Sequence, residues 1–285
     1  MIWVKGEIVA DDSLQISVLD RTFEHGLGLF ETFRTWNRHA TLLPRHLERL
    51  ARSARDLDLP LDPKSVPDQN AVDALLAADR RDTDVMLRIT LSGGLAEEGS
   101  SVLWMRSFPL PPPTKPEGWT ADVGLWEVSA SNPLARYKSL NYWERRLASS
   151  MAVGRGSDET LSRSPDGSPM EGTLWEGSRT NLFVGIGDRL VTPAVGPDEP
   201  IVPGIMRALV VERAEALEIR VIQVPITDEI LDRATEAFLT NSVRGIIPLK
   251  QIGGLVLENT PGALSVQLWN DILPWLESGG LEPSP

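Results

Sequence analysis

Apolar residues recur along this chain with two different periods, and the alternation between them predicts a mixed α/β protein. Apolar positions three and four residues apart predict amphipathic helices, as in the run Leu43, Leu47, Leu50, Ala54 and Leu57. Runs of branched and aromatic residues between turn-forming residues predict strands. The expected helices lie at 44–59, 68–78, 140–151, 201–217, from 227, and at 263–276. The expected strands lie at 30–35, 85–91, 101–108, 120–128, 173–184, 189–192 and 237–242.

Three segments carry weaker patterns. Residues 1–20 alternate and predict a first hairpin, with Asp11 and Asp12 in its turn. Residues 154–169 are rich in Gly, Ser, Asp and Pro, which predicts a loop or a long hairpin. We expect the tail from Gly279 to Pro285 to be disordered.

A proline-rich stretch divides the chain. At 285 residues the chain exceeds the usual size of one domain. Residues 109–116 contain prolines that continue neither a sheet nor a helix, and they indicate a stiff linker. We therefore expect an N-terminal α/β domain at 1–112, a linker at 113–119 and a C-terminal α/β domain at 120–285.

Composition narrows the class of protein. A net charge of −12 argues against a nucleic-acid partner, although local arginines can reverse the field inside a pocket. No apolar stretch of the sequence is long enough to predict a membrane span. The absence of cysteine excludes disulfides and thiol catalysis, and no metal-ligand spacing is present, so we expect no metal site. A cytoplasmic enzyme fits these observations best.

Lys138 is the candidate nucleophile. The chain holds five lysines against twenty-three arginines, and arginine stays protonated, so few amines are available for covalent chemistry. Lys138 lies among apolar and aromatic residues, just before a helix for which Ser139 is a suitable N-cap. Desolvation there would lower the pKa of the amine. The same pattern also fits an ordinary lysine whose stem packs while its head reaches water.

Three further sites follow from the pattern alone. Arg34, on a face of a predicted strand, needs an anionic partner if it is buried, which makes it a candidate for a substrate carboxylate. Glu176 is either a solvated turn residue or a fixed carboxylate that faces a cationic ligand. The helix that begins near Ile205 presents unpaired backbone N–H groups, which favour an anion. His25 fits a structural hydrogen-bonding role better than catalysis.

Four motifs together resemble one known family. They are His46-x-x-Arg49-Leu50, Lys138-Ser139-Leu140-Asn141-Tyr142, Glu176-Gly177-Ser178-x-x-Asn181-Leu182-Phe183 and Gly204-Ile205-Met206-Arg207. In this order they resemble the class IV aminotransferases, the fold-type IV group of pyridoxal-phosphate enzymes. The resemblance implies an α/β (α+β) fold of two domains, pyridoxal 5'-phosphate in the cleft between them, and a homodimer that closes the site.

The resemblance also implies roles for two charged residues. Lys138 would bond covalently to the cofactor aldehyde and then move a proton once substrate displaces it. Glu176 would pair with the pyridine nitrogen and keep it protonated. Glu171 competes for this role, because it also precedes a glycine, but only Glu176 has Asn181 at the family's distance.

Other cofactor contacts follow in the same way. Arg49 would bind the cofactor phosphate, together with the backbone N–H groups of Ile205 and Met206. Tyr142 would donate a hydrogen bond to the oxygen on the cofactor ring.

The resemblance leaves the reaction open. Met206 and Asn241 look like the 4-amino-4-deoxychorismate lyase branch, which forms 4-aminobenzoate and pyruvate for folate biosynthesis. Branched-chain aminotransferases remain an alternative, and so, less well, do D-amino-acid aminotransferases, because the loop after 91 lacks their Arg-x-His motif. The alternative from another functional class is a protein that keeps this fold, or binds the cofactor, but catalyses no reaction. Arg34, Arg88 and Arg244 are the candidates to meet substrate carboxylates, beside Asn241.

Overall fold

The computed structural model describes residues 1–95 and 99–280, so the tail from 281 lies outside the described residues. The chain forms two compact units. The first unit contains Met1–Pro111, Tyr137–Asn141 and the residues from Pro274 onward. The second contains Pro112–Arg136 and Tyr142–Leu273. The short segment that carries Lys138 therefore belongs to the first unit, whereas the sequence prediction assigned it to the second domain.

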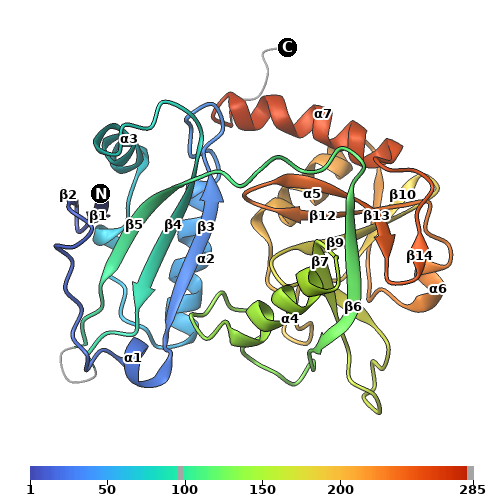
Figure 1. Ribbon diagram of the computed structural model, residues 1–285, viewed down its shortest axis with the longest axis horizontal. Coiled ribbons are helices and arrows are strands. Elements are labelled where there is room, and N and C mark those ends of the chain that lie inside the picture. The colour runs from blue at the N-terminus through green and yellow to red at the C-terminus, as the bar shows by residue number, and fades with distance from the viewer. Residues whose placement is uncertain (96–98, 281–285) are drawn as a thin grey trace. The chain divides into compact units, whose positions relative to one another are not determined.

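The first unit is an antiparallel sheet with helices (Figure 1). Its strands among the described residues follow the order β2-β1-β5-β4-β3. They are β1 (Ile2–Val4), β2 (Glu7–Val9), β3 (Gly28–Arg34), β4 (Val85–Ser92) and β5 (Leu103–Pro109). The helices are α1 (Arg21–His25), α2 (Leu43–Asp56), the 3₁₀ turn η1 (Pro63–Ser65) and α3 (Gln69–Ala78). Side-chain caps begin three of them, since Asp20 accepts from the backbone N–H of Thr22, Asp62 from that of Lys64 and Asp68 from that of Ala71.

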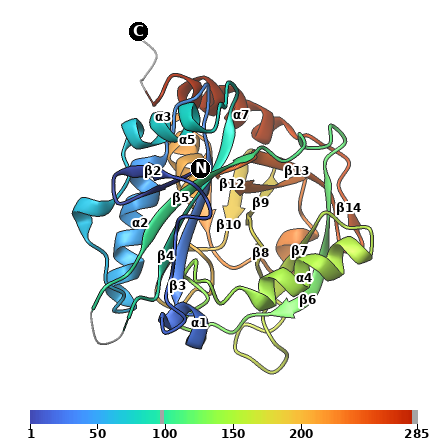
Figure 2. The same cartoon turned by 60° about the vertical axis from the view of Figure 1, so that its left-hand side comes forward.

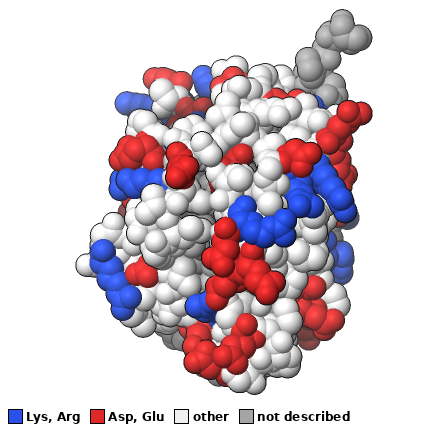
Figure 3. All heavy atoms as spheres, turned by 90° about the vertical axis from the view of Figure 1, so that its right-hand side faces the viewer, with Lys and Arg blue, Asp and Glu red and all other residues white. Residues whose placement is uncertain are grey.

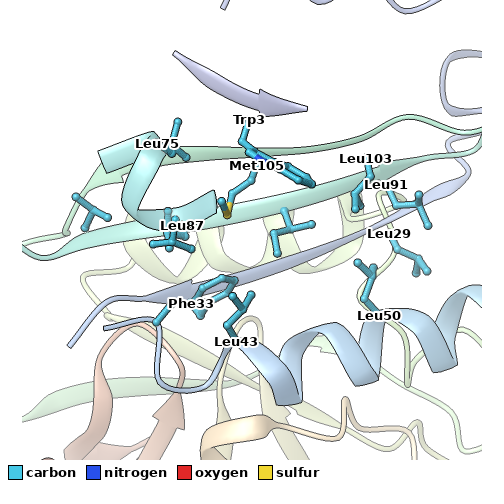
Figure 4. Close-up of a cluster of buried hydrophobic side chains, with 14 of the residues drawn as sticks. Trp3, Leu29, Phe33, Leu43, Leu50, Leu75, Leu87, Leu91, Leu103 and Met105 are labelled. Atoms are coloured by element: carbon cyan, nitrogen blue, oxygen red, sulfur yellow. The ribbon is translucent and has the colours of Figure 1, made fainter. Parts of the chain in front are cut away.

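The core of the first unit lies between its sheet and α2 and α3 (Figure 4). Strand side chains alternate between two faces, so Leu29 and Phe33 of β3 point toward Leu43 and Leu50 of α2. Figure 4 shows Leu87, Leu91, Leu103 and Met105 joining this layer. The opposite face of the same strands carries Phe30, Arg88 and Arg106, whereas Glu31 points to the α2 side with Leu29 and Phe33.

The first hairpin lies nearer the N-terminus than the sequence predicted. Strands β1 and β2 pair across Lys5 and Gly6, whose φ angles are 49° and 87°. Two positive φ angles fit the tight two-residue turn that matches strand twist, and glycine adopts one at little cost. The turn predicted at Asp11 and Asp12 does not join two strands, because residues 14–18 are not in a strand.

The second unit is a curved sheet that closes on itself. Its strands among the described residues run β11-β10-β9-β12-β13-β6-β7-β8, with β14 beside β13, and a further pairing of β8 with β9 completes a ring. They are β6 (Trp119–Glu127), β7 (Glu159–Arg163), β8 (Leu174–Gly177), β9 (Asn181–Ile186), β10 (Arg189–Thr192), β11 (Arg220–Gln223), β12 (Glu236–Asn241), β13 (Gly245–Ile252) and β14 (Leu255–Val256). Residues 154–169 contain β7, which pairs with β8 in a long hairpin.

Helices pack on this sheet (Figure 2). They are α4 (Trp143–Gly154), α5 (Ile205–Ala216), α6 (Asp228–Leu231) and α7 (Ala263–Glu277), of which α7 passes into the first unit at Pro274. The sheet encloses a core that includes Leu161, Leu182, Leu239 and Ile247. Acidic and basic side chains are interspersed on the face of the molecule drawn in Figure 3.

The buried face of α4 differs from the prediction. Trp143, Leu147 and Met151 are exposed, to 79%, 58% and 39%, whereas Arg145 and Ala148 are buried with Ala152 on the face toward β6 and β7. The N-cap is Tyr142 rather than Ser139, and it makes no side-chain capping hydrogen bond. Small alanines let the helix approach the sheet closely, and the arginine finds an acidic partner there, so the apolar stripe faces outward.

Candidate functional site

Lys138 lies beside β3 in the first unit. The backbone N–H of Phe30 donates to the Lys138 carbonyl at 2.9 Å, and that of Leu140 donates to the Gly28 carbonyl at 3.0 Å. The segment 137–141 thus lies along the edge of β3. A side chain at Gly28 would collide with Leu140 and with the Leu91 carbonyl, and φ there is 141°, so glycine is required for this approach. The half-buried amine of Lys138 lies 4.6 Å from the centroid of the Phe30 ring.

Arg49 is held by a buried carboxylate in the same unit. Its Nε and Nη2 donate to the two oxygens of Glu31 at 2.8 and 2.5 Å, and Nδ1 of His46 lies 2.7 Å from Glu31. Glu31 is on β3, while His46 and Arg49 project from α2 at a spacing of three residues. Burial opposes ionisation of Glu31, but the charge of Arg49, together with the contact from His46, outweighs it and lowers the pKa of Glu31 to about 2. The fork of two parallel hydrogen bonds fixes the guanidinium in one orientation.

The depressed pKa of Glu31 predicts a loss of stability in acid. Its folded value of about 2 lies below the ordinary 4.5, so the carboxylate stabilises the fold above pH 4.5. That contribution, roughly 3 kcal/mol at 1.36 kcal/mol per unit, is lost as the pH falls from 4.5 toward 2. Urea unfolding at pH 7, 4.5 and 3 measures it. The Glu31→Gln variant should show a flatter dependence on pH over this range, and an unchanged dependence would contradict the assignment.

Glu176 is a fixed anion in the second unit. It lies where β8 and β9 meet, directly opposite Asn181 in the register. The carboxylate accepts from Asn181 Nδ2 at 3.0 Å and from the backbone N–H of Val202 at 3.1 and 3.2 Å, and it is 2% exposed. The competitor Glu171 is exposed and accepts from the backbone N–H of Gly167. Burial and fixed donors make Glu176 the better partner for a cation.

The buried partner of Glu176 is Arg145, which the sequence analysis missed. Arg145 Nη2 donates to Glu176 at 2.5 Å and to the Ala135 carbonyl at 3.1 Å, and its guanidinium carbon lies 4.7 Å from the Trp126 ring. Burial opposes its charge, but Glu176 outweighs that effect and raises the pKa of Arg145. One signal was present in the sequence, since Arg145 shares a helical face with Ala148 and Ala152.

A second buried carboxylate shapes the turn after Glu176. Glu159 on β7 accepts from the backbone N–H of Ser178 at 3.1 Å, from its hydroxyl at 2.5 Å and from the Thr180 hydroxyl at 3.2 Å. These bonds fix the turn between β8 and β9 and hence the place of Glu176. Nothing in the sequence indicated this role, because β7 falls in a segment predicted to be a loop or a long hairpin.

Two further predicted cofactor contacts lie in the second unit. The Tyr142 hydroxyl donates to the Ser178 carbonyl at 2.7 Å, and burial raises the pKa of the phenol, which therefore stays protonated at neutral pH. Ile205 and Met206 form the first turn of α5 after the N-cap Gly204. First-turn N–H groups have no acceptor within the helix, and the helix dipole adds partial positive charge. A side chain at Gly204 would collide with Asn181, so glycine lets this turn approach the strand that carries Asn181.

The residues expected to meet substrate have different surroundings. Arg34 forms an ion pair with Asp84 at 2.9 Å, and Asn241 Oδ1 accepts from the backbone N–H groups of Val243 and Arg244. Arg244 also donates to the Pro112 carbonyl at 2.6 Å. These contacts give all three a local structural role. Their part in substrate binding stays a prediction.

Arg88 has a different setting. Its guanidinium carbon lies 3.9 Å from the centroid of the Phe30 ring, the ring that Lys138 also contacts. Both cations lie close to the same ring. The separation between the Arg88 guanidinium carbon and the Lys138 amine is therefore at most the sum of these two distances. A cation so close to the candidate nucleophile is well placed for a carboxylate on the same substrate.

Two kinds of feature are absent from the part of the chain that the structure describes. Residues 1–95 and 99–280 hold no group of three or more His, Cys, Asp or Glu side chains that could bind a metal ion. No helix within these ranges is long and apolar enough to cross a membrane.

Comparison with known proteins places the chain in a family. The sequence profile of the amino-transferase class IV family matches residues 28–252. A putative branched-chain-amino-acid aminotransferase of Methanocaldococcus jannaschii is 30% identical over 268 residues, covering 90% of each chain. Aminodeoxychorismate lyase of Bacillus subtilis is 28% identical over 265 residues, covering 88% of this chain and 86% of the relative.

Comparison with solved structures shows the same fold. A branched-chain aminotransferase of Thermoproteus uzoniensis with norvaline superposes with a TM-score of 0.83 at 27% identity, covering 99% of this chain and 95% of that one. The mixed α and β architecture is therefore that of the fold-type IV enzymes. The chain belongs to the class IV aminotransferase family of enzymes, whose cofactor is pyridoxal phosphate.

Proposed function

We propose that this enzyme is a lyase that converts 4-amino-4-deoxychorismate into 4-aminobenzoate and pyruvate. The observation that carries the proposal is the pair of cations on the Phe30 ring, which sets the Lys138 amine beside a guanidinium suited to a substrate carboxylate. Met206 at the start of α5 and Asn241 at the end of β12 favour the lyase branch over the aminotransferases. The Bacillus subtilis relative carries the lyase name.

The residues present fit pyridoxal phosphate. Glu176 is a buried anion with fixed hydrogen-bond donors, which suits a protonated ring nitrogen. Gly204 and the first turn of α5 suit the phosphate, by the same physics that places anions at helix N-termini. Arg49 adds a rigidly oriented guanidinium of the kind that binds phosphate.

Each of these residues has a proposed role in the reaction. The Lys138 amine holds the cofactor covalently and afterwards accepts and returns protons at its Nζ. Glu176 keeps the ring nitrogen charged, while Arg49, Ile205 and Met206 hold the phosphate. The neutral phenol of Tyr142, whose one O–H donates to the Ser178 carbonyl, would turn that O–H to the cofactor's ring oxygen when the cofactor is bound. When bound, the cofactor supplies an electron sink that stabilises negative charge on the substrate carbon.

One assay separates the two reactions. The holoenzyme incubated with 4-amino-4-deoxychorismate, without any 2-oxo acid, should form 4-aminobenzoate and pyruvate in equal amounts, because the lyase needs no amino-group acceptor. Fluorescence detection of 4-aminobenzoate after chromatography measures the product. If product forms only when a 2-oxo acid is added, or amino groups merely pass between 2-amino and 2-oxo acids, the lyase proposal fails.

A branched-chain aminotransferase is the second candidate. The Methanocaldococcus jannaschii relative, at 30% identity, and the Thermoproteus uzoniensis structure both carry that name. Glu31, on the strand that carries Phe30, also fits this group. Transfer of the amino group from an L-branched amino acid to 2-oxoglutarate would support this reading.

We also propose that the protein is a homodimer. Trp143, Leu147 and Met151 form an outward apolar stripe on α4, and apolar patches of this kind mark association surfaces. Sedimentation equilibrium at micromolar concentration should give twice the chain mass of 31.3 kDa, and Leu147→Lys should weaken association. A monomer under these conditions would contradict the proposal.

A further inference from the structure

Two arginines face each other across neighbouring strands of the first unit. In the antiparallel pairing of β4 with β5, Arg88 lies directly opposite Arg106. Directly opposed residues project from the same face of a sheet, with Cβ atoms about 4.5–5.5 Å apart. This face therefore offers two guanidinium groups to a substrate that carries two carboxylates.

We propose that Arg88 and Arg106 form a clamp for the two carboxylates of a dicarboxylate substrate built on a six-membered ring. The proposal rests on the proposed function, because it specifies the substrate of the same site. It adds a residue, Arg106, to which neither the sequence analysis nor the family motifs assign a role. It also explains how a protein with a net charge of −12 attracts a dianion, since the field is reversed locally.

Both arginines line one pocket of about 330 Å³ in the first unit. A volume of this size holds a small ligand. Trp104, Arg106 and Phe108 are alternate residues of β5, so they share the pocket face, and all three line the pocket. The pocket thus offers apolar rings on either side of a cation, an arrangement that suits an unsaturated ring whose carboxylates reach the arginine.

The pocket adjoins the candidate nucleophile. Leu140, two residues after Lys138, lines its wall. Arg88 contacts the same Phe30 ring as the Lys138 amine. The guanidinium carbon of Arg88 lies over the Phe30 ring, and a guanidinium in such a contact can still bind a carboxylate through its N–H groups. A substrate held by the clamp therefore extends toward Lys138.

Asp11 is the acidic residue that the structure places against Arg106. Arg106 Nη2 lies 3.7 Å from Asp11 Oδ2, and the two side chains are 45% and 53% exposed. Asp11 lies closer, at 2.8 Å, to the amino group of Met1. An exposed and salt-screened ion pair contributes little, so a substrate carboxylate displaces Asp11 at small cost.

The clamp predicts a preference among substrates. A cyclic dicarboxylate can contact both guanidinium groups, whereas a monocarboxylate with an aliphatic side chain can contact only one of them. The enzyme should therefore favour a dianionic ring acid over a branched-chain amino acid, and Arg106 should determine that preference.

Isothermal titration calorimetry of the holoenzyme with isophthalate and benzoate tests the clamp. The wild type should bind isophthalate, the dianion, more tightly than benzoate. Arg106→Gln should lower this preference by about tenfold, the loss expected for one charge-assisted contact, with benzoate affinity little changed. Arg106→Lys keeps the charge without the fork and should lose part of the preference. Arg52→Gln, an exposed arginine on α2, is the matched control and should lose none.

The outcomes separate this proposal from the proposed function. Equal binding of the two probes, or a preference that Arg106→Gln leaves intact, overturns the clamp. An Arg106-dependent preference in an enzyme that forms no 4-aminobenzoate upholds the clamp and overturns the lyase. Formation of 4-aminobenzoate with an unchanged KM in Arg106→Gln upholds the lyase and overturns the clamp. Because Arg106 is half exposed, the variant should fold, and its thermal midpoint checks this.

Discussion

Replacing Lys138 with alanine is expected to lower kcat by at least about 10³-fold, within the range that positioned proton-transfer groups contribute. The reason is that few other side chains can supply a nucleophilic amine. The chain has only four other lysines, and arginine cannot be deprotonated. The purified variant should also lose visible absorbance, because the covalent link to the cofactor is lost. Steady-state turnover and an absorbance spectrum measure the two effects.

Two control variants test whether activity requires the amine of Lys138 rather than only its positive charge. Lys138→Arg keeps a cation that can still stack on the Phe30 ring, but it provides no nucleophile, so it should be as inactive as the alanine variant. Lys64→Ala, an exposed lysine of the same unit, should keep full activity. Substantial turnover by Lys138→Arg would show that the residue acts only through its charge.

Replacing Arg145 with methionine is expected to destabilise the protein by about 3–5 kcal/mol, because the change leaves Glu176 as a buried charge without its arginine. Methionine keeps an unbranched stem of similar reach, so lost packing contributes little. The remaining donors, Asn181 and the backbone N–H of Val202, lower but do not remove the cost. Urea unfolding at neutral pH measures the loss.

A double variant provides the control. Replacing Glu176 with glutamine in the Arg145→Met background removes the buried charge and should recover most of the lost stability. It should not recover activity, since glutamine cannot keep a ring nitrogen protonated. If Arg145→Met alone costs less than about 1 kcal/mol, the ion pair is not the buried, desolvated interaction described here.

Hydrophobic periodicity indicated most elements, and the errors have a common physical cause. The helices at 43–56 and 69–78 and the strand at 85–92 match their predicted ranges closely, because each has one buried face. On α4, periodicity identified the helix but not the buried side. Its apolar stripe is exposed, and the face with Arg145 and Ala148 is buried instead. Periodicity reports that a helix has two faces, and only the tertiary contacts decide which one is covered.

The sequence did not predict which residues become partners across the sheets. Arg145 and Glu176 are 31 residues apart, and their contact depends on how β8 and β9 meet and where α4 packs. Arg88 and Arg106 oppose each other only through the register of β4 and β5. By contrast, a sequence motif identified Arg49, yet nothing in its spacing of 18 residues from Glu31 indicated that the two form a bidentate pair. Local motifs identified candidate residues, whereas register determined their partners.

The most direct test of the central claim is to locate the cofactor on the chain. The holoenzyme is reduced with borohydride and digested, and the peptides are analysed by mass spectrometry. The chain holds five lysines, Lys5, Lys64, Lys115, Lys138 and Lys250, so the result is unambiguous. We predict the reduced phosphopyridoxyl mass on the peptide that contains Lys138 and on no other. The same mass on any other lysine, or on none, would contradict the account.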